Sequence, residues 1–262
     1  MKLRYHLYAS SALAVALVLA GCSKKEEAPA QQAAAPASAP AAAAIDPATV
    51  ATITGTVKLD GTAPKPVRLK TDSDPYCSKA HASSPLESEE VVVDKNNDLA
   101  NVVVYIKSGL EGRTFPTPAT SVELDQSGCE YKPHVVAVMV NQPLSIVNSD
   151  QTTHNIHPTP ANNPDWNKSQ PPGADKITDS FAREEVAIPV KCNVHSWMKS
   201  YIAVLKSPFF AVTKADGTFE IKGLPPGEYT ITAWQEKLGS TDQKITVGPK
   251  ETKKVDFSIK GS

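Results

Sequence analysis

The residues best suited to chemistry stand in one short segment, residues 191–198, which read KCNVHSWM. Within it Cys192, His195 and Met198 follow one another at intervals of three residues. Thiolate, imidazole and thioether are soft or intermediate donors, and two His and one Cys with a weak axial Met favour copper in a one-electron transfer site. The segment therefore predicts three ligands of a mononuclear copper site, and a second histidine must come from elsewhere in the chain.

The sequence around this segment indicates a connection between two β-strands rather than a helix. Apolar residues alternate with others over 186–190, and Pro189 within this run is incompatible with a helix interior. A second β-rich run, YIAVL, follows at 201–205. We therefore expect Cys192 to end the first strand and Met198 to open the second, with the histidine in the turn between them.

An upstream segment, residues 134–158, supplies the missing histidine. It reads HVVAVMVNQPLSIVNSDQTTHNIHP, in which two strand patterns are separated by a turn and a polar loop leads to His154. The order of a strand, N-S-D, H-N and then C-x-x-H-x-x-M resembles the cupredoxins, the blue copper proteins, and the short ligand loop resembles that of amicyanin. This resemblance covers about residues 115–206.

The resemblance implies a cupredoxin β-sandwich and one type 1 copper ion, with the ligands His154, Cys192, His195 and Met198. It also implies that Asn155 braces the ligand loop by hydrogen bonds. His157, three residues after His154, is the alternative first ligand. Zinc competes for Cys and His but prefers closed sets of sulfur, nitrogen and carboxylate ligands.

The four cysteines of the chain divide into distinct roles. Cys22 lies in the N-terminal segment described next, and Cys192 belongs to the predicted metal site. Cys77 and Cys129 remain, and in an oxidising compartment spare thiols tend to pair, which favours a disulfide between them. Two separate thiols are the alternative, as is a weaker reading in which Cys129 and His134 help to bind metal.

Residues 1–22 read MKLRYHLYASSALAVALVLAGC and have the build of a secretion signal. The ending LAGC resembles the lipobox of bacterial lipoproteins, which implies cleavage before Cys22 and lipid attachment to it. Ser23 after the cysteine implies sorting to the outer membrane, so the protein is expected in the periplasm and held at the membrane by its lipid. Residues 23–48 are rich in Ala and Pro and are predicted to be a disordered tether.

The C-terminal part predicts a second β-sandwich. Asp216-Gly217 is a hairpin signal, and LPPG at 224–227 turns into YTITAW. These features resemble the carboxypeptidase regulatory-like domains, which are transthyretin-like sandwiches, and GTVKLDG at 55–61 and LANVVVYI at 99–106 resemble their first strands.

We therefore expect residues 49–110 and 207–262 to form one sandwich, with the cupredoxin domain at 111–206 inserted between them. A C-terminal segment of about 55 residues is small for a core of its own, which favours this split. The alternative is that residues 49–110 add strands to the cupredoxin domain.

Composition and charge limit the fold class and the kinds of partner that we expect. The 22 prolines and short Val/Ile/Thr/Tyr runs indicate an all-β protein. The net charge of −1, from 27 basic and 28 acidic residues, does not favour a nucleic-acid partner.

The sequence has neither a hydrolytic triad nor a substrate-binding copper pair, so we do not expect an enzyme. We expect a lipid-anchored electron carrier that exchanges electrons with redox protein partners. The imidazole of His195, flanked by Trp197, is expected to be exposed and to face such a partner. Alternatives are copper storage or delivery and a metal-free binding module.

Overall fold

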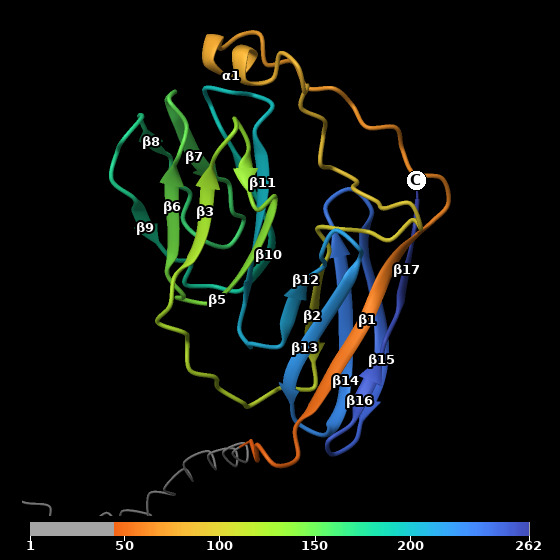
Figure 1. Cartoon of the computed structure of the whole chain (residues 1–262). Coiled ribbons are helices and arrows are strands. Elements are labelled where there is room, and N and C mark those ends of the chain that lie inside the picture. The colour runs from red at the N-terminus through yellow and green to blue at the C-terminus, as the bar shows by residue number, and fades with distance from the viewer. Residues whose placement is uncertain (1–44, 262) are drawn as a thin grey trace, which may run out of the picture. The chain divides into compact units, whose positions relative to one another are not determined.

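The computed structural model describes residues 45–261, and these residues are almost entirely β-strand and connecting loop (Figure 1). One six-residue helix, α1 (Pro75–Ala80), accompanies the seventeen strands of this range. The predicted all-β class is confirmed. The predicted signal sequence, the lipid-bearing Cys22 and most of the predicted tether lie outside the described residues.

The described residues begin before the predicted end of the tether. Residues 45–49 form a turn in which the N–H of Thr49 donates to the carbonyl of Asp46. Ile45 packs against the apolar core that follows. Residues 45–48, predicted to belong to the tether, therefore take part in the described fold, because an apolar side chain is available there to bury. Among residues 45–261 there is no helix of the length and apolar character that a membrane span requires.

Two sheets form what we call the outer sandwich. In the first, β1 (Ala51–Asp60) pairs antiparallel with β13 (Thr218–Leu224) and parallel with β16 (Thr252–Lys254) and β17 (Phe257–Lys260). The second has the order β12 (Phe210–Val212), β2 (Val103–Ser108), β14 (Gly227–Gln235) and β15 (Gly239–Val247). Strands from before residue 110 thus share both sheets with strands from after residue 206.

The side-chain alternation of β1 explains its place in the outer sandwich. Ile53, Val57 and Leu59 are buried and face the core shared with the second sheet, whereas the intervening residues are partly or fully exposed. Gly55 stands in the same buried row. A Cβ atom at this position would lie 1.8 Å from the carbonyl oxygen of Val255, so the close approach of the chains requires glycine.

The remaining two sheets form the metal-site sandwich. The larger sheet has the order β5 (Val135–Met139), β11 (Lys199–Leu205), β10 (Glu185–Lys191), β7 (His154–Pro158) and β8 (Lys168–Gln170). The smaller has the order β4 (Tyr131–Lys132), β3 (Val122–Gln126), β6 (Leu144–Asn148) and β9 (Ile177–Asp179). Apolar side chains of both sheets pack between them and include the buried Cys192 and Met198.

The chain between β1 and β2 does more than connect two strands of the outer sandwich. Its residues 69–86, which we call the capping segment, contain α1 and a disulfide from Cys77 to Cys129 of the metal-site sandwich. Leu69, Tyr76 and Leu86 pack around that disulfide. Figure 1 shows α1 over one end of the metal-site sandwich. Part of the segment predicted to belong to the outer sandwich therefore covers the other sandwich.

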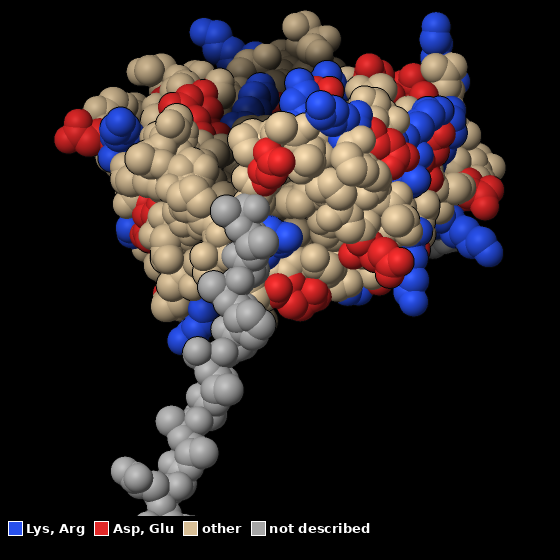
Figure 2. Space-filling view, turned by 90° about the horizontal axis from the view of Figure 1, so that it is seen from below, with Lys and Arg blue, Asp and Glu red and all other residues tan. Residues whose placement is uncertain are grey.

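The two sandwiches share a contact surface. Val103 of the outer sandwich packs with Val135, Ala203 and Leu205 of the metal-site sandwich. Beside these residues the ring of His134 contacts Glu236 across the same surface. Basic and acidic side chains are interspersed over the face of the molecule shown in Figure 2, as the balanced composition implies.

The Asp216-Gly217 signal marks a turn, but the predicted hairpin is wrong. Gly217 has φ +69°, and its N–H donates to the carbonyl of Lys214. The strands on either side, β12 and β13, pair with β2 and β1 in different sheets. The physical reason is that turn residues determine only the local reversal of the chain. Burial of the apolar faces of β12 and β13 determines their sheets and places the two strands on opposite sides of the core.

Candidate metal centre

The loop that carries the predicted ligands closes a β-hairpin. Strands β10 and β11 pair antiparallel up to Lys191 and Lys199, and Cys192 and Met198 follow directly inside this last pair. The N–H of Cys192 donates to the carbonyl of Met198 at 3.3 Å, and the N–H of Met198 donates to that of His195 at 3.0 Å. The predicted positions of the three ligands relative to the two strands agree with this arrangement.

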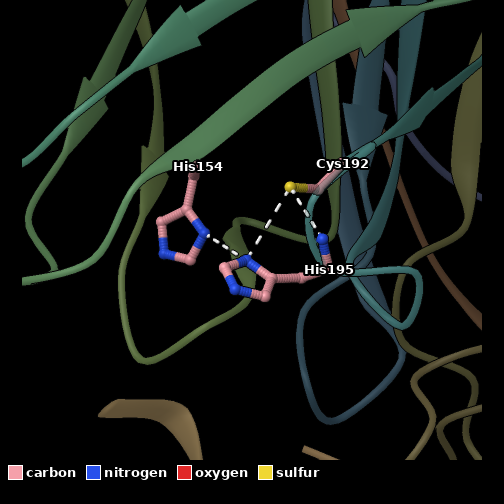
Figure 3. Close-up of side chains that lie close together, drawn as sticks. All are labelled: His154, Cys192 and His195. Carbon is pink, nitrogen blue, oxygen red and sulfur yellow. Dashed lines mark hydrogen bonds between the residues drawn. The ribbon is translucent and has the colours of Figure 1, made fainter. Parts of the chain in front are cut away.

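His154 comes to the same place from a separate strand. It opens β7, whose last two residues pair antiparallel with the last two of β10, so the start of β7 extends past the end of β10 toward the ligand loop. Ring nitrogens of His154 and His195 and the Sγ of Cys192 all lie within 4.8 Å of one another (Figure 3). The two Nδ1 atoms are 2.8 Å apart, and the Cys192 Sγ is 3.8 Å from the His195 Nδ1.

All three side chains are buried. The exposed fraction is 0% for His154, 3% for Cys192 and 1% for His195. Met198 is also buried and belongs to the same apolar core as Cys192. The structure thus brings two imidazole nitrogens and a sulfur to one point inside the protein, with a thioether residue in the adjoining core.

The electrostatics of the cluster favour a thiolate. Burial by itself would raise the pKa of Cys192, but His154 and N–H groups of the ligand loop lower it. Burial by itself would lower the pKa of His154, yet its hydrogen bond to Asp150 and the neighbouring Cys192 sulfur raise this pKa to about 9. Burial lowers the pKa of His195. A metal cation can replace the proton that the His154–Cys192 pair holds.

Asn155 ties the ligand loop to β7. Its Oδ1 accepts hydrogen bonds from the N–H of Asn193 at 2.6 Å and of Val194 at 3.3 Å. Its Nδ2 donates to the Oδ1 of Asn167. The N–H of His195 donates to the Cys192 Sγ at 3.3 Å. These contacts hold the loop around the sulfur, which is the role that the cupredoxin resemblance implies for Asn155.

The alternative ligand, His157, points away from the cluster. Its Nε2 lies 3.0 Å from the Asp165 Oδ1, and its Nδ1 lies 3.1 Å from the Asn193 Oδ1. The Nε2 of His134 instead contacts Glu236. Of His134, His154 and His157, the structure places His154 with Cys192 and His195.

The prediction that His195 faces solvent is wrong. Its Nε2 lies 3.3 Å from the Asp74 Oδ2, and its ring packs on that of Trp197 with centroids 4.9 Å apart. The Trp197 indole donates to the carbonyl of Cys129 at 3.1 Å. The physical reason is the capping segment, which the disulfide fastens over this side of the site. The residues next to His195 in the sequence do not indicate that the capping segment, which is distant along the chain, covers its imidazole.

Two carboxylates at the site were not predicted. Asp150 is 3% exposed, and its Oδ2 lies 2.8 Å from the His154 Nε2. Asp74 lies against the His195 Nε2 from the capping segment. For Asp150 the spacing of four residues from His154, within the N-S-D motif, is a usable signal. For Asp74 the sequence offers only its place as the N-cap before Pro75.

The cysteines that form the disulfide are distinct from the cysteine with a free thiol. Cys77 and Cys129 are joined, and Cys192 is the free cysteine of the described residues. Two other groupings of possible ligands lie nearby, but each includes one of the joined cysteines, whose sulfur is already bonded. The grouping of His154, Cys192 and His195 is therefore the one that can offer a thiolate to a metal.

The donor set fits copper. Two imidazole nitrogens and one thiolate in a buried site, with Met198 beside them, are the ligand types of a mononuclear electron-transfer copper centre. Zinc sites commonly close with a fourth sulfur, nitrogen or carboxylate ligand. Here the nearby carboxylates instead contact the outer nitrogens of the two imidazoles.

Comparisons with known proteins give partial likenesses. The sequence model of the carboxypeptidase regulatory-like domain matches residues 202–260, from within β11 to β17. No curated protein sequence matches the chain. A purple cupredoxin from Nitrosopumilus maritimus is similar in structure, with 19% identity and a TM-score of 0.27 over 31% of this chain and 97% of that one.

Two further structures show similar coverage of this chain. An oxidized mutant of amicyanin matches with 14% identity and a TM-score of 0.30, over 38% of this chain and 97% of that one. The copper-containing nitrite reductase from Thermus scotoductus SA-01 matches with 18% identity and a TM-score of 0.31 over 39% of this chain. The match spans 25% of the reductase. The chain is thus similar in part to a carboxypeptidase regulatory-like domain and in part to cupredoxins.

Proposed function

We propose that this protein is an electron carrier that binds one type 1 copper ion through His154, Cys192, His195 and Met198. The observation that carries the proposal is the convergence of two imidazole nitrogens and one thiol sulfur, from two separate elements, within 4.8 Å in the protein interior. When bound, copper supplies the one-electron couple between its two oxidation states.

The surrounding residues suit rapid electron transfer. Asn155 holds the N–H groups of Asn193 and Val194, and the β10–β11 pairing holds both ends of the ligand loop. A ligand set fixed in this way changes little in geometry between two oxidation states, which keeps the reorganisation small. Burial of the ligands also excludes water, which competes for the metal.

Copper storage or delivery is the second candidate, and one feature favours it. A cavity of about 370 Å³ borders Met198 and Trp197 and is also lined by His134, Glu89 and Glu130. Such a cavity offers a path for an ion toward the thioether. A delivery protein releases Cu(I) readily to a competing chelator, whereas a carrier with four buried ligands retains it.

We further propose that the protein acts in the periplasm, anchored to the outer membrane by lipid on Cys22, and exchanges electrons with other redox proteins rather than catalysing a reaction. The signal sequence and lipobox-like ending support the location. Labelling cells with a radioactive fatty acid tests the anchor: the mature protein takes up label, and a Cys22→Ser variant does not.

Spectroscopy of the purified protein tests the copper proposal. On addition of Cu(II) we expect intense visible absorption from thiolate-to-copper charge transfer and a reversible one-electron couple. Cys192→Ser abolishes the absorption, whereas Ser196→Ala, in the same loop but without a ligand atom, retains it. Bound copper without this absorption in the parent protein contradicts the proposal, and rapid loss of Cu(I) to a chelator favours delivery instead.

A further inference from the structure

Both imidazoles of the candidate metal centre have a carboxylate at the nitrogen that faces away from the other ligands. His154 directs Nδ1 to the cluster and places Nε2 2.8 Å from the Asp150 Oδ2. His195 likewise directs Nδ1 to the cluster and places Nε2 3.3 Å from the Asp74 Oδ2. Each of the two ligand imidazoles therefore has an acidic side chain at its Nε2.

Asp150 is held by several donors in the protein interior. Its Oδ1 accepts from the N–H of Gly128 at 2.7 Å and from the hydroxyl of Tyr76 at 3.2 Å. Its Oδ2 accepts from the N–H of Cys129 at 2.7 Å, in addition to its contact with His154. Because only 3% of this side chain is exposed, its charge acts on the imidazole with little screening by water.

Asp74 is held in a comparable way at the N-cap of α1. Its Oδ1 accepts from the N–H of Cys77 at 2.9 Å, and its Oδ2 accepts from the hydroxyl of Thr152 at 2.9 Å. The His195 Nε2 is near this Oδ2, but the alignment is not that of a hydrogen bond, and the nitrogen has no other partner. Asp74 is also more exposed than Asp150, at 17% of its side chain.

The disulfide connects the two carboxylates. Cys77 donates its N–H to Asp74, Cys129 donates its N–H to Asp150, and the two cysteines are bonded to each other. The capping segment also provides Tyr76, which donates to Asp150. One cross-link thus fixes both acidic side chains relative to both ligand imidazoles.

We propose that Asp74 and Asp150, held in place by the Cys77–Cys129 disulfide, are positioning residues that set the metal's preference between oxidation states toward Cu(II). The inference rests on the proposed copper function. A carboxylate at the outer nitrogen of a ligating histidine fixes the ring and makes the metal-bound nitrogen a stronger donor. Two nearby negative charges, of which that of Asp150 is buried, also stabilise the more highly charged ion. Asp150 has the larger effect, because it is more buried and its hydrogen bond is aligned.

The test compares three Asp→Asn variants, each of which removes a carboxylate next to a different histidine. Asp150→Asn and Asp74→Asn remove the charges that bracket the ligands. Asp165→Asn is the matched control, since Asp165 makes the same kind of contact, at 3.0 Å, to the non-ligand His157. The readouts are the Cu(II) and Cu(I) affinities and the reduction potential, each measured on purified protein.

For Asp150→Asn we expect the ratio of Cu(II) to Cu(I) affinity to fall by about 10- to 100-fold, if the loss of metal affinity that follows removal of an outer partner falls mainly on Cu(II). This change corresponds to a rise in reduction potential of about 59 to 118 mV. Asp74→Asn is expected to raise it by less, and Asp165→Asn to leave it at the parent value. Equal potentials in all four proteins overturn the inference.

Tyr76→Phe provides a second variant in case Asp150→Asn disturbs folding. This substitution removes one hydrogen-bond donor from Asp150. More of the negative charge of the carboxylate then acts on His154, so the reduction potential should fall rather than rise. A rise in this variant contradicts the inference. Failure of the copper function itself has a different signature, because the parent protein then lacks the thiolate-to-copper absorption, whereas failure of the inference alone leaves that absorption intact.

Discussion

The Nε2 atom of His195 lies 3.3 Å from the Oδ2 of Asp74, and the ring of this downstream ligand also packs on that of Trp197. His195 is 1% exposed, whereas Val194, directly before it, is 53% exposed. Asn193 is exposed as well. The residues of the ligand loop that reach solvent are therefore Asn193, Val194 and Ser196, and not the imidazole of His195.

This exposure predicts where a redox reagent approaches the site. We expect Val194→Glu to slow oxidation by the anion hexacyanoferrate(III), and Val194→Lys to accelerate it, by roughly 3- to 20-fold at low ionic strength. Stopped-flow absorbance measures the rates. Ser258→Glu, which adds the same charge at an exposed position of β17, is the control and should leave the rate near that of the parent. Equal rates for both Glu variants would place the approach elsewhere.

The contacts of the two histidines on β7 predict different consequences of substitution. His154→Gln should abolish the thiolate-to-copper absorption, since it removes one of the three converging donors. His157→Gln should retain it, because both nitrogens of His157 contact Asp165 and Asn193 instead. Titration with Cu(II), followed by visible absorption, compares the pair. Loss of colour in both variants would mean that His157 moves to the metal.

The disulfide is expected to contribute strongly to stability. Cys77 and Cys129 are separated by 52 positions, and closing a loop of this length stabilises the folded state by about 4 kcal/mol in the chain-entropy estimate. The double variant Cys77→Ala/Cys129→Ala should lose about this much free energy of unfolding, measured by urea denaturation. A second readout is the rate at which a chelator removes copper, which should increase as the capping segment loosens over His195.

A control for the disulfide variant is Ser78→Ala, an α1 residue adjacent to Cys77 whose side chain makes no hydrogen bond within residues 45–261. It should match the parent protein in both readouts. If the double variant unfolds at the parent's urea concentration and releases copper no faster, the capping segment is held by its other contacts alone.

The buried contact between the sandwiches predicts a pH dependence of stability. Burial by itself would lower the pKa of His134, but Glu236, and more weakly Glu89, raise it above 6.5. A histidine whose pKa is raised on folding stabilises the folded state fully below about pH 6.5, and this stabilisation is lost as the pH rises through the folded-state pKa. Tyr201 and the carboxylates of Glu89 and Glu236 are the titratable groups that face the ring.

Urea denaturation of the parent and of His134→Gln between pH 5 and 9 measures this dependence. The difference in free energy of unfolding should be largest at the acidic end and should shrink toward the alkaline end. Burial also raises the pKa of Glu89, which acts in the same direction, so Glu89→Gln separates the two contributions. A difference that is constant over the range would show that the pKa of His134 is not shifted on folding.

Much of the fold could be anticipated because it depends on local patterns. Alternating apolar residues in β5 and β6, and the run interrupted by Pro189 in β10, indicated strands that the structure contains. The turn at Asp216-Gly217 was also anticipated, but its sheet pairing was not. Turn chemistry acts over a few residues, whereas pairing depends on which apolar faces meet in the core.

The candidate ligands were also readable from the sequence, because their chemical types and spacing are local facts. Cys192, His195 and Met198 share one loop, and His154 ends the polar loop of a neighbouring strand. A metal site needs these donors in a small volume, and short loops between paired strands provide it. Sequence reasoning left His154 and His157 both open, and the side chains' contacts now distinguish them.

The amino-acid sequence by itself determined the all-β character of the protein, the types of donor atom available and the loop that carries most of them. Only the tertiary structure decided that Asp74 and Asp150 stand behind the two imidazoles, that the capping segment covers His195 and that Val194 reaches solvent. The reason is physical: donor chemistry and strand alternation belong to neighbouring residues, whereas burial and electrostatic contact depend on which distant segments the folded core and the disulfide bring together.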